Sequence, residues 1–317
     1  MRGTAAHWIA LVVCVIWPRP AGAQAWIPPA GEGSVSLVHQ FARSDEHINR
    51  DGVGTRALGT SSFHSVSAEV SYGVGRRIAV DGSLVWLATK WTGEPERFAP
   101  SVPHGPLDDG TYNSTFQDAR VAVRYQLALR PVAISPFVAF GGPTRAYDTR
   151  GHSAFGRARK ELQAGVSAGR DFRARGGVGY LHAGASYTIS RRIEAIPLDL
   201  DHINGDFEAV VPASARVNVR GFGSWQVMRD GLKLGPQTDH KELRPIHDRL
   251  ARSSYLPGGL GATIALRPDV DLGISGFVTA AARNAHGVRV LVTGLTWKFG
   301  GQFKIDPPGR VSSARAK

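Results

Sequence analysis

The clearest pattern along the chain is an alternation of apolar and polar residues. From Ser65 to Tyr72, valine, alanine and tyrosine occupy every second position, and serine or glutamate occupies the positions between them. The segment from Asp118 to Tyr125 alternates in a similar way. Successive side chains of a β-strand point to opposite faces, whereas a helix would mix the two sets. Both segments are therefore predicted to be strands with one apolar and one polar face.

The same template, applied along the whole chain, predicts about twelve antiparallel strands. They are expected near residues 34–43, 62–73, 77–91, 115–126, 132–142, 158–170, 178–189, 214–228, 232–236, 254–267, 270–281 and 287–299. Short connections at 74–77, 127–131, 171–177, 229–231 and 267–269 alternate with longer ones near 44–61, 92–114, 143–157, 190–213 and 237–253.

This alternation in loop length favours one fold class. Bacterial outer-membrane barrels have an even number of strands, short periplasmic turns and longer outer loops. The sequence thus predicts an all-β, membrane-spanning, antiparallel up-and-down barrel over 34–299, with periplasmic segments at 24–33 and 300–317. A soluble β-sandwich is the alternative, but its loops need not alternate so regularly in length.

The first 23 residues have the features of an export signal. Arg2 is followed by an apolar core from Trp8 to Trp17, and small residues around Ala23 form a cleavage site. The apolar core is too short to span a bilayer as a helix. Cys14, the one cysteine of the chain, lies within this leader, so the mature protein has no thiol chemistry.

The charge of the chain narrows the set of partners. Of 38 Lys and Arg residues two lie in the leader, which leaves 36 against 26 acidic residues, a net charge of about +10. Such a charge attracts anions. For an exported protein we expect outer-membrane lipid, lipopolysaccharide and a small-molecule solute as partners, and the barrel-assembly machinery during insertion. Nucleic acid is not an expected partner.

If the apolar faces point to lipid, the opposite faces carry charges that line the interior. A charged side chain facing lipid costs roughly 2–4 kcal/mol near the bilayer centre, so energy and pattern favour the same register. This interior could form a permeation path or a closed network of ion pairs. The residues predicted to line the lumen are Glu69, Asp81, Asp118, Arg120, Arg124, Glu161, Arg216, Asn218, Arg220 and Asp271.

No convincing catalytic, cofactor or metal site stands out. The run from Asp199 to Asp206 is rich in oxygen ligands, but Ile203 and Val210 occupy positions where an EF-hand calcium loop needs ligands, so an outer loop is expected here. An outer-membrane hydrolase of the phospholipase type would need a serine, a histidine and an orienting group within reach of one another. No spacing in the sequence brings such a set together.

Several short motifs carry a resemblance to one known family. They are Ala25 to Gly33, Ser135 to Pro143, Arg283 to His286 and Leu291 to Phe299. Through these motifs the chain is similar to outer-membrane proteins associated with the meta-pathway of phenol degradation and to their transporter relatives. The resemblance implies an outer-membrane barrel that passes small, often hydrophobic or aromatic, molecules, and it implies no catalytic residue. The tail 300–317 departs from the family, whose chains commonly end at the aromatic residue of the last strand.

Overall fold

The computed structural model describes residues 25–93, 107–174, 176–191, 199–231, 251–306 and 310–313. The signal peptide predicted for residues 1–23 lies outside this part of the chain. The strands are β1 (Gly33–Ile48), β2 (Gly54–Gly73), β3 (Ile78–Gly93), β4 (Asn113–Tyr125), β5 (Ala133–Pro143), β6 (Lys160–Ala174), β7 (Gly177–Arg191), β8 (His202–Pro212), β9 (Val217–Met228), β10 (Ser254–Arg267), β11 (Val270–Arg283), β12 (Ala285–Phe299), β13 (Phe303–Asp306) and β14 (Arg310–Ser313).

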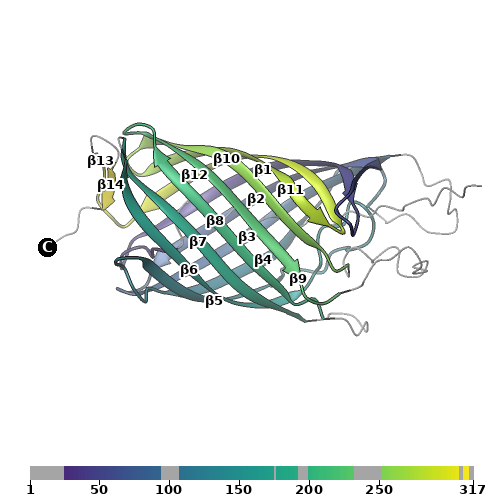
Figure 1. Ribbon diagram of the computed structural model, residues 1–317, viewed down its shortest axis with the longest axis horizontal. Coiled ribbons are helices and arrows are strands. Elements are labelled where there is room, and N and C mark those ends of the chain that lie inside the picture. The colour runs from purple at the N-terminus through teal and green to yellow at the C-terminus, as the bar shows by residue number, and fades with distance from the viewer. Residues whose placement is uncertain are drawn as a thin grey trace, which may run out of the picture.

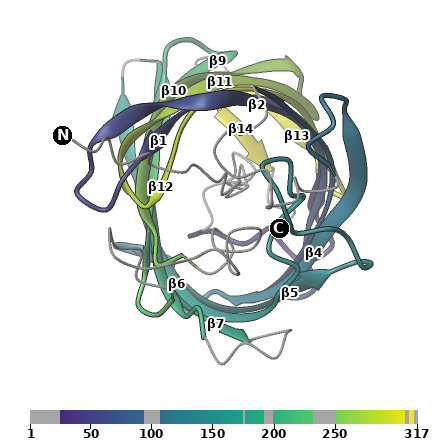
Figure 2. The ribbon, with the colours of Figure 1, turned by 90° about the vertical axis from the view of Figure 1, so that its right-hand side faces the viewer.

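Strands β1 to β12 form one closed antiparallel barrel, in which each strand pairs with its neighbours along the chain. The ring closes where β12 pairs with β1, so that Trp297 lies opposite Val35 and Val290 opposite Ala42. Closure leaves the sheet without an unpaired edge. The strands are inclined to the barrel axis (Figure 1), and the end-on view in Figure 2 shows the closed ring. The predicted all-β barrel of twelve strands is confirmed.

The two faces of the barrel are inverted relative to a water-soluble protein. Exterior side chains such as Leu37, Val121 and Phe140 are 57, 55 and 57 % exposed. The side chains buried within the barrel include many small polar ones, among them Ser36 and Ser135, which are 2 and 0 % exposed. Both sets follow the two-residue period of the sequence, which confirms the predicted alternation.

Strand β8 corrects the prediction that 190–213 is a long loop. In β8 the exposed residues Ile203, Phe207 and Val211 alternate with inward residues, most of which are polar. The apolar face is interrupted in sequence by Gly205, but the ring of Trp225 on β9 covers that glycine in space. A gap in the apolar pattern therefore hid a regular strand, because an aromatic residue on the neighbouring strand fills the position.

Because β8 was not predicted, the connections on either side of it were also assigned to the wrong residues. The turn between β8 and β9 lies at 213–216, so the predicted short turn at 229–231 is wrong: these residues follow β9 and begin the connection to β10. The predicted strand 232–236 lies outside the described residues. The barrel nevertheless has the predicted number of twelve strands, and β8 is the one among them that was not predicted.

The remaining connections alternate in length as predicted, except for two short ones at the long-loop end, of which one is the single residue Asn284 between β11 and β12. The connection between β1 and β2 covers only 49–53, because both strands continue to the pair Ile48 and Gly54. Beyond the barrel, β13 and β14 pair as a small hairpin at the end that carries the short turns (Figure 1). Among the described residues, no helix has the length and apolar character needed to cross a bilayer.

Candidate functional site: the lumen of the barrel

The strands place every predicted lumen residue on the inner wall except Arg216. Arg216 is exposed in the turn 213–216, where the backbone amides of Ala213 and Ser214 bond to the carbonyl of Val217 and close the turn. The prediction for Arg216 is therefore wrong, because β9 begins one residue later. The residues on the inner wall are Glu69, Asp81, Asp118, Arg120, Arg124, Glu161, Asn218, Arg220 and Asp271.

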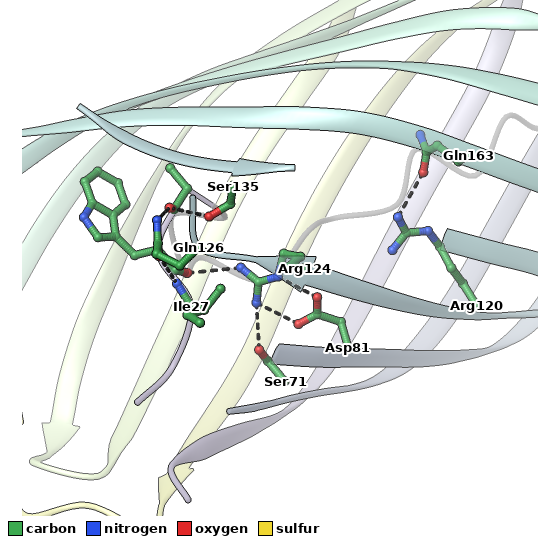
Figure 3. A network of polar contacts seen from close by, with 10 residues as sticks. Ile27, Ser71, Asp81, Arg120, Arg124, Gln126, Ser135 and Gln163 are labelled. Atoms are coloured by element: carbon green, nitrogen blue, oxygen red, sulfur yellow. Dashed lines mark hydrogen bonds and ion pairs between the residues drawn. The ribbon is translucent and has the colours of Figure 1, made fainter. Parts of the chain in front are cut away.

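Arg124 is the most completely bonded of these residues. Its Nε and Nη2 donate to the carboxylate of Asp81 at 2.7 and 2.8 Å, and Nη2 also donates to Ser71 Oγ at 3.0 Å. Its side chain is 8 % exposed. A bidentate pair of this kind is geometrically specific. Arg124 and Asp81 are therefore a structural pair in the wall, shown in Figure 3, and contribute little net charge to the lumen.

A second network crosses the opposite side of the wall around Arg220. Its Nη1 donates to Glu208 Oε1 at 3.2 Å and its Nη2 to Ser275 Oγ at 3.1 Å, while the guanidinium lies 4.8 Å from the ring centre of Phe222. The second oxygen of Glu208 accepts a hydrogen bond from Tyr180 at 2.9 Å. The network thus joins β7, β8, β9 and β11.

The other inward charges also have polar partners. Arg120 donates to the neutral side-chain oxygen of Gln163 at 2.9 Å. Asn218 is half-buried near the short-turn end, opposite Pro212 and Thr263. The carboxylates pair as follows: Glu69 with Ser67 at 3.1 Å, Asp118 with Tyr147 at 2.6 Å, Glu161 with Ser190 at 3.2 Å and Asp271 with Lys298 at 2.7 Å.

The chain before β1 lies inside the short-turn end of the barrel. The side chain of Gln126 donates to the carbonyl of Ala25 at 3.0 Å and accepts from the amide of Ile27 at 3.0 Å. It thus bonds to the backbone of this segment in the way that a neighbouring strand would. Ser135 Oγ donates to the same carbonyl of Ala25 at 2.9 Å. Arg124 Nη1 donates to the carbonyl of Trp26 at 3.1 Å (Figure 3).

The wall is shaped to receive this N-terminal segment, residues 25–32. Trp26 makes an edge-on contact with Tyr180 of β7, with ring centres 6.0 Å apart. On β6, a Cβ added to Gly169 would lie 2.7 Å from the Cβ of Ala25 and would overlap the ring of Trp26. The glycine therefore leaves the space that the tryptophan fills. The segment narrows this end of the lumen.

The connection 144–159 enters the lumen from the other end. Phe155 is 5 % exposed and packs with Phe63 and Leu87 on the inner wall. Thr89 Oγ1 donates to the carbonyl of Ser153 at 2.6 Å, and Gln117 donates to the carbonyl of Phe155 at 2.6 Å. This connection therefore narrows the lumen at the long-loop end.

A carboxylate outside the strands fixes the tip of this connection. The backbone amides of His152 and Ser153 both donate to Asp108 at 2.8 Å. Burial alone would raise the pKa of Asp108, but its hydrogen bonds with His152 and Ser153 outweigh burial and hold the pKa below its usual value. Trp91 of β3 lies inside the barrel and stacks on His152, with ring centres 4.7 Å apart.

A cavity of about 350 Å³ lies in the lumen. Its wall combines the charged groups of Asp118, Arg120, Glu161 and Arg220 with the rings of Phe222 and Phe277. Phe277 belongs to an inward-facing apolar cluster together with valines of β1 and β12. The cavity thus offers both apolar contact and charged or hydrogen-bonding groups, as small-molecule sites commonly do.

Several residues of the site were missed by sequence reasoning. Glu208 was missed because β8 was taken for a loop, although its spacing from Asp206 follows the two-residue period. Gln126 and Trp26 were missed because nothing in a single sequence shows that the N-terminal segment folds back into the barrel. Within the described ranges, no group of three or more His, Cys, Asp or Glu residues could hold a metal ion.

Solved structures that resemble this chain include one with a TM-score above 0.5. An outer membrane channel from Pseudomonas putida F1 superposes with a TM-score of 0.64 at 10 % identity, over 88 % of this chain and 99 % of that one. The NanC porin has a TM-score of 0.47 at 10 % identity, over 83 and 100 % of the two chains. The translocator domain of the autotransporter NalP from Neisseria meningitidis has a TM-score of 0.45 at 10 % identity, over 86 and 90 %.

The sequence itself has no such counterpart. No protein-family model matches the chain, and no curated protein matches it in sequence. The likeness to the Pseudomonas channel, at its low identity, establishes the shared barrel fold.

Proposed function

We propose that the protein spans the outer membrane of a Gram-negative cell and forms a narrow channel for small molecules, without a catalytic step. The observation that carries this proposal is the inverted barrel: an apolar exterior surrounds a polar wall that encloses a cavity of about 350 Å³. A belt of exposed valine, leucine and phenylalanine is stable in hydrocarbon and unfavourable in water. Export would use the leader, cleaved near Ala23.

The cavity also suggests the class of solute. Phe222, Phe277 and their valine neighbours offer apolar contact, and Arg120 and Arg220 lie among carboxylates. This combination suits small aromatic or hydrophobic molecules, whether neutral or singly charged. It agrees with the resemblance to the phenol-degradation family and with the fold shared with the Pseudomonas channel.

A closed structural barrel is the second candidate, favoured by the segments that enter both ends of the lumen. Planar-bilayer recordings of refolded protein distinguish the two. We expect discrete openings of small conductance, with weak ion preference because Arg124 and Arg220 are paired with Asp81 and Glu208. Benzoate, benzyl alcohol and glucose, tested in turn as blockers, rank the solute classes. Absence of any conductance in the wild type and in a variant with the N-terminal segment removed would overturn the channel.

In the proposed setting the partners are outer-membrane lipid, lipopolysaccharide and the barrel-assembly machinery. An outer-membrane hydrolase of the phospholipase type is the third candidate. Two histidines near serine or threonine in the sequence lie on different faces of the barrel: His64 lies beside His39 at 3.2 Å on the outside, and His182 lies beside Asp206 at 3.3 Å inside.

A further inference from the structure

A row of three cationic side chains and one serine crosses four neighbouring strands near the long-loop end. Arg289 on β12 lies directly opposite Arg43 on β1, Arg43 lies opposite Ser62 on β2, and Ser62 lies opposite Lys90 on β3. Residues that are directly opposite in a sheet project from the same face. The four side chains, which we name the basic row, therefore lie on one face of the barrel.

That face is the exterior. Leu291 follows Arg289 by two residues on β12 and is 54 % exposed on the outer wall. On β1 it lies opposite Phe41, which precedes Arg43 by two residues. Because the two-residue period keeps alternate residues on one face, Arg289 and Arg43 also point outward. The Arg289 side chain is 74 % exposed.

The basic row has an unfavourable charge arrangement for an isolated barrel. Two arginines directly opposite each other repel, and like-charge pairs of this kind destabilise a sheet. Among the described residues, Asp45 is the one carboxylate in ion-pair contact with the row, at 3.7 Å from Arg289. Lys90 instead lies 5.5 Å from the ring centre of Tyr112. An external anion would relieve the repulsion.

The height of the basic row matches a membrane boundary. The opposite boundary is indicated by the exposed aromatic residues Tyr72 and Trp297 near the short turns. Gly33 lies opposite Tyr72, and the rise from Gly33 to Arg43 along a strand tilted by about 40° corresponds to roughly 25 Å along the axis. This is the height of the apolar band of outer-membrane barrels.

We propose that the basic row binds the phosphate groups of lipopolysaccharide in the outer leaflet, with the acyl chains lying along Phe41 and Leu291. The inference rests on the proposed outer-membrane location, but not on conduction. The long-loop end faces outward in such barrels, and the outer leaflet there carries a bisphosphorylated glycolipid. Arginine is suited to phosphate because its planar fork can donate two hydrogen bonds.

Binding of purified lipid A to the refolded protein in detergent micelles tests this proposal. The variant Arg43→Gln with Arg289→Gln removes two exposed charges from the row. The control variant Arg216→Gln with Arg267→Gln removes two exposed charges from the short-turn end. We expect at least a tenfold weaker affinity for lipid A in the first variant and less than a twofold change in the control. Heat-modifiable migration on gels confirms that each variant is folded.

Enzymatically dephosphorylated lipid A and phosphatidylglycerol are the comparison ligands. The proposal expects both to bind wild type at least tenfold more weakly than lipid A. Equal affinity for lipid A in all three proteins, or equal affinity for the dephosphorylated lipid, would overturn it. Conductance of the same preparations separates the two proposals. A barrel that binds lipid A but does not conduct would overturn the proposed channel and leave the basic row intact. A barrel that conducts but does not bind lipid A would overturn the basic row and leave the channel intact.

Discussion

Individual residues of the inner wall act mainly through their pairing. Arg124 and Asp81 are a nearly buried pair, and removal of one partner leaves the other charge uncompensated. We expect Arg124→Gln and Asp81→Asn each to lower the free energy of unfolding by about 3–5 kcal/mol, with the double variant less affected than the sum. Urea unfolding in lipid vesicles measures these changes.

The pair of Arg267 and Asp269 provides the control for that cycle. The side chain of Arg267 is 72 % exposed, and exposed ion pairs contribute about 0–1 kcal/mol. Arg267→Gln should therefore be nearly neutral. If Arg124→Gln is as mild as this control, the inner pair is not structural, and Arg124 would instead be available as a permeation charge.

On the exterior, the chemical class of a residue matters more than its shape. Val121 is 55 % exposed, so Val121→Leu should insert normally, whereas Val121→Arg should lose roughly 2–4 kcal/mol in lipid. Folding yields of the two variants in lipid vesicles, compared at equal protein concentration, give the result. Equal yields would mean that this face does not contact hydrocarbon.

At the scale of elements, the N-terminal segment is the part that controls access to the lumen. Gly169→Val places methyl groups where Trp26 and Ala25 now lie, so it should displace residues 25–32 and raise single-channel conductance severalfold. Gly141→Ala is the matched control, because its added Cβ would make ordinary contact at 3.6 Å with the carbonyl of Ala119. Unchanged conductance in Gly169→Val, with the segment shown to be protease-sensitive, would mean that the segment does not limit flow.

The elements also show what the sequence can and cannot predict. The regular strands β2 and β4 were predicted from their alternation alone, and their faces are as expected. Strand β8 was missed, because Gly205 breaks an apolar face that Trp225 completes from another strand. Arg216 was placed in the lumen because the strand was predicted to begin at residue 214, whereas β9 begins at Val217 and leaves Arg216 in the preceding turn. The inward course of the N-terminal segment depends on contacts with Gln126 and Ser135, which are about 100 residues or more away in the chain.

For the whole molecule, the orientation in the membrane is the decisive prediction. The connection 49–53 and the turn 74–77 lie at opposite ends of β2. We expect Asp51→Cys to react with a membrane-impermeant maleimide on intact cells, and Arg76→Cys to react only after the outer membrane is permeabilised. The reverse labelling pattern would mean that the barrel has the opposite orientation in the membrane. It would also place the basic row at the periplasmic leaflet.

The serine-rich inner wall has a consequence for how this protein can change over time. Ser36, Ser61, Ser135 and Ser167 are each at most 2 % exposed, so an added methyl group would have no room. The exterior residues face the acyl chains of the membrane, which are fluid and adapt to side chains of different shape. One aliphatic side chain there can therefore replace another. Homologous chains should therefore drift fastest at their hydrophobic positions and slowest at small polar ones, which is the opposite of a water-soluble domain. A search profile that weights buried hydrophobic residues would fail to detect relatives of this chain, even where the inner wall is nearly unchanged.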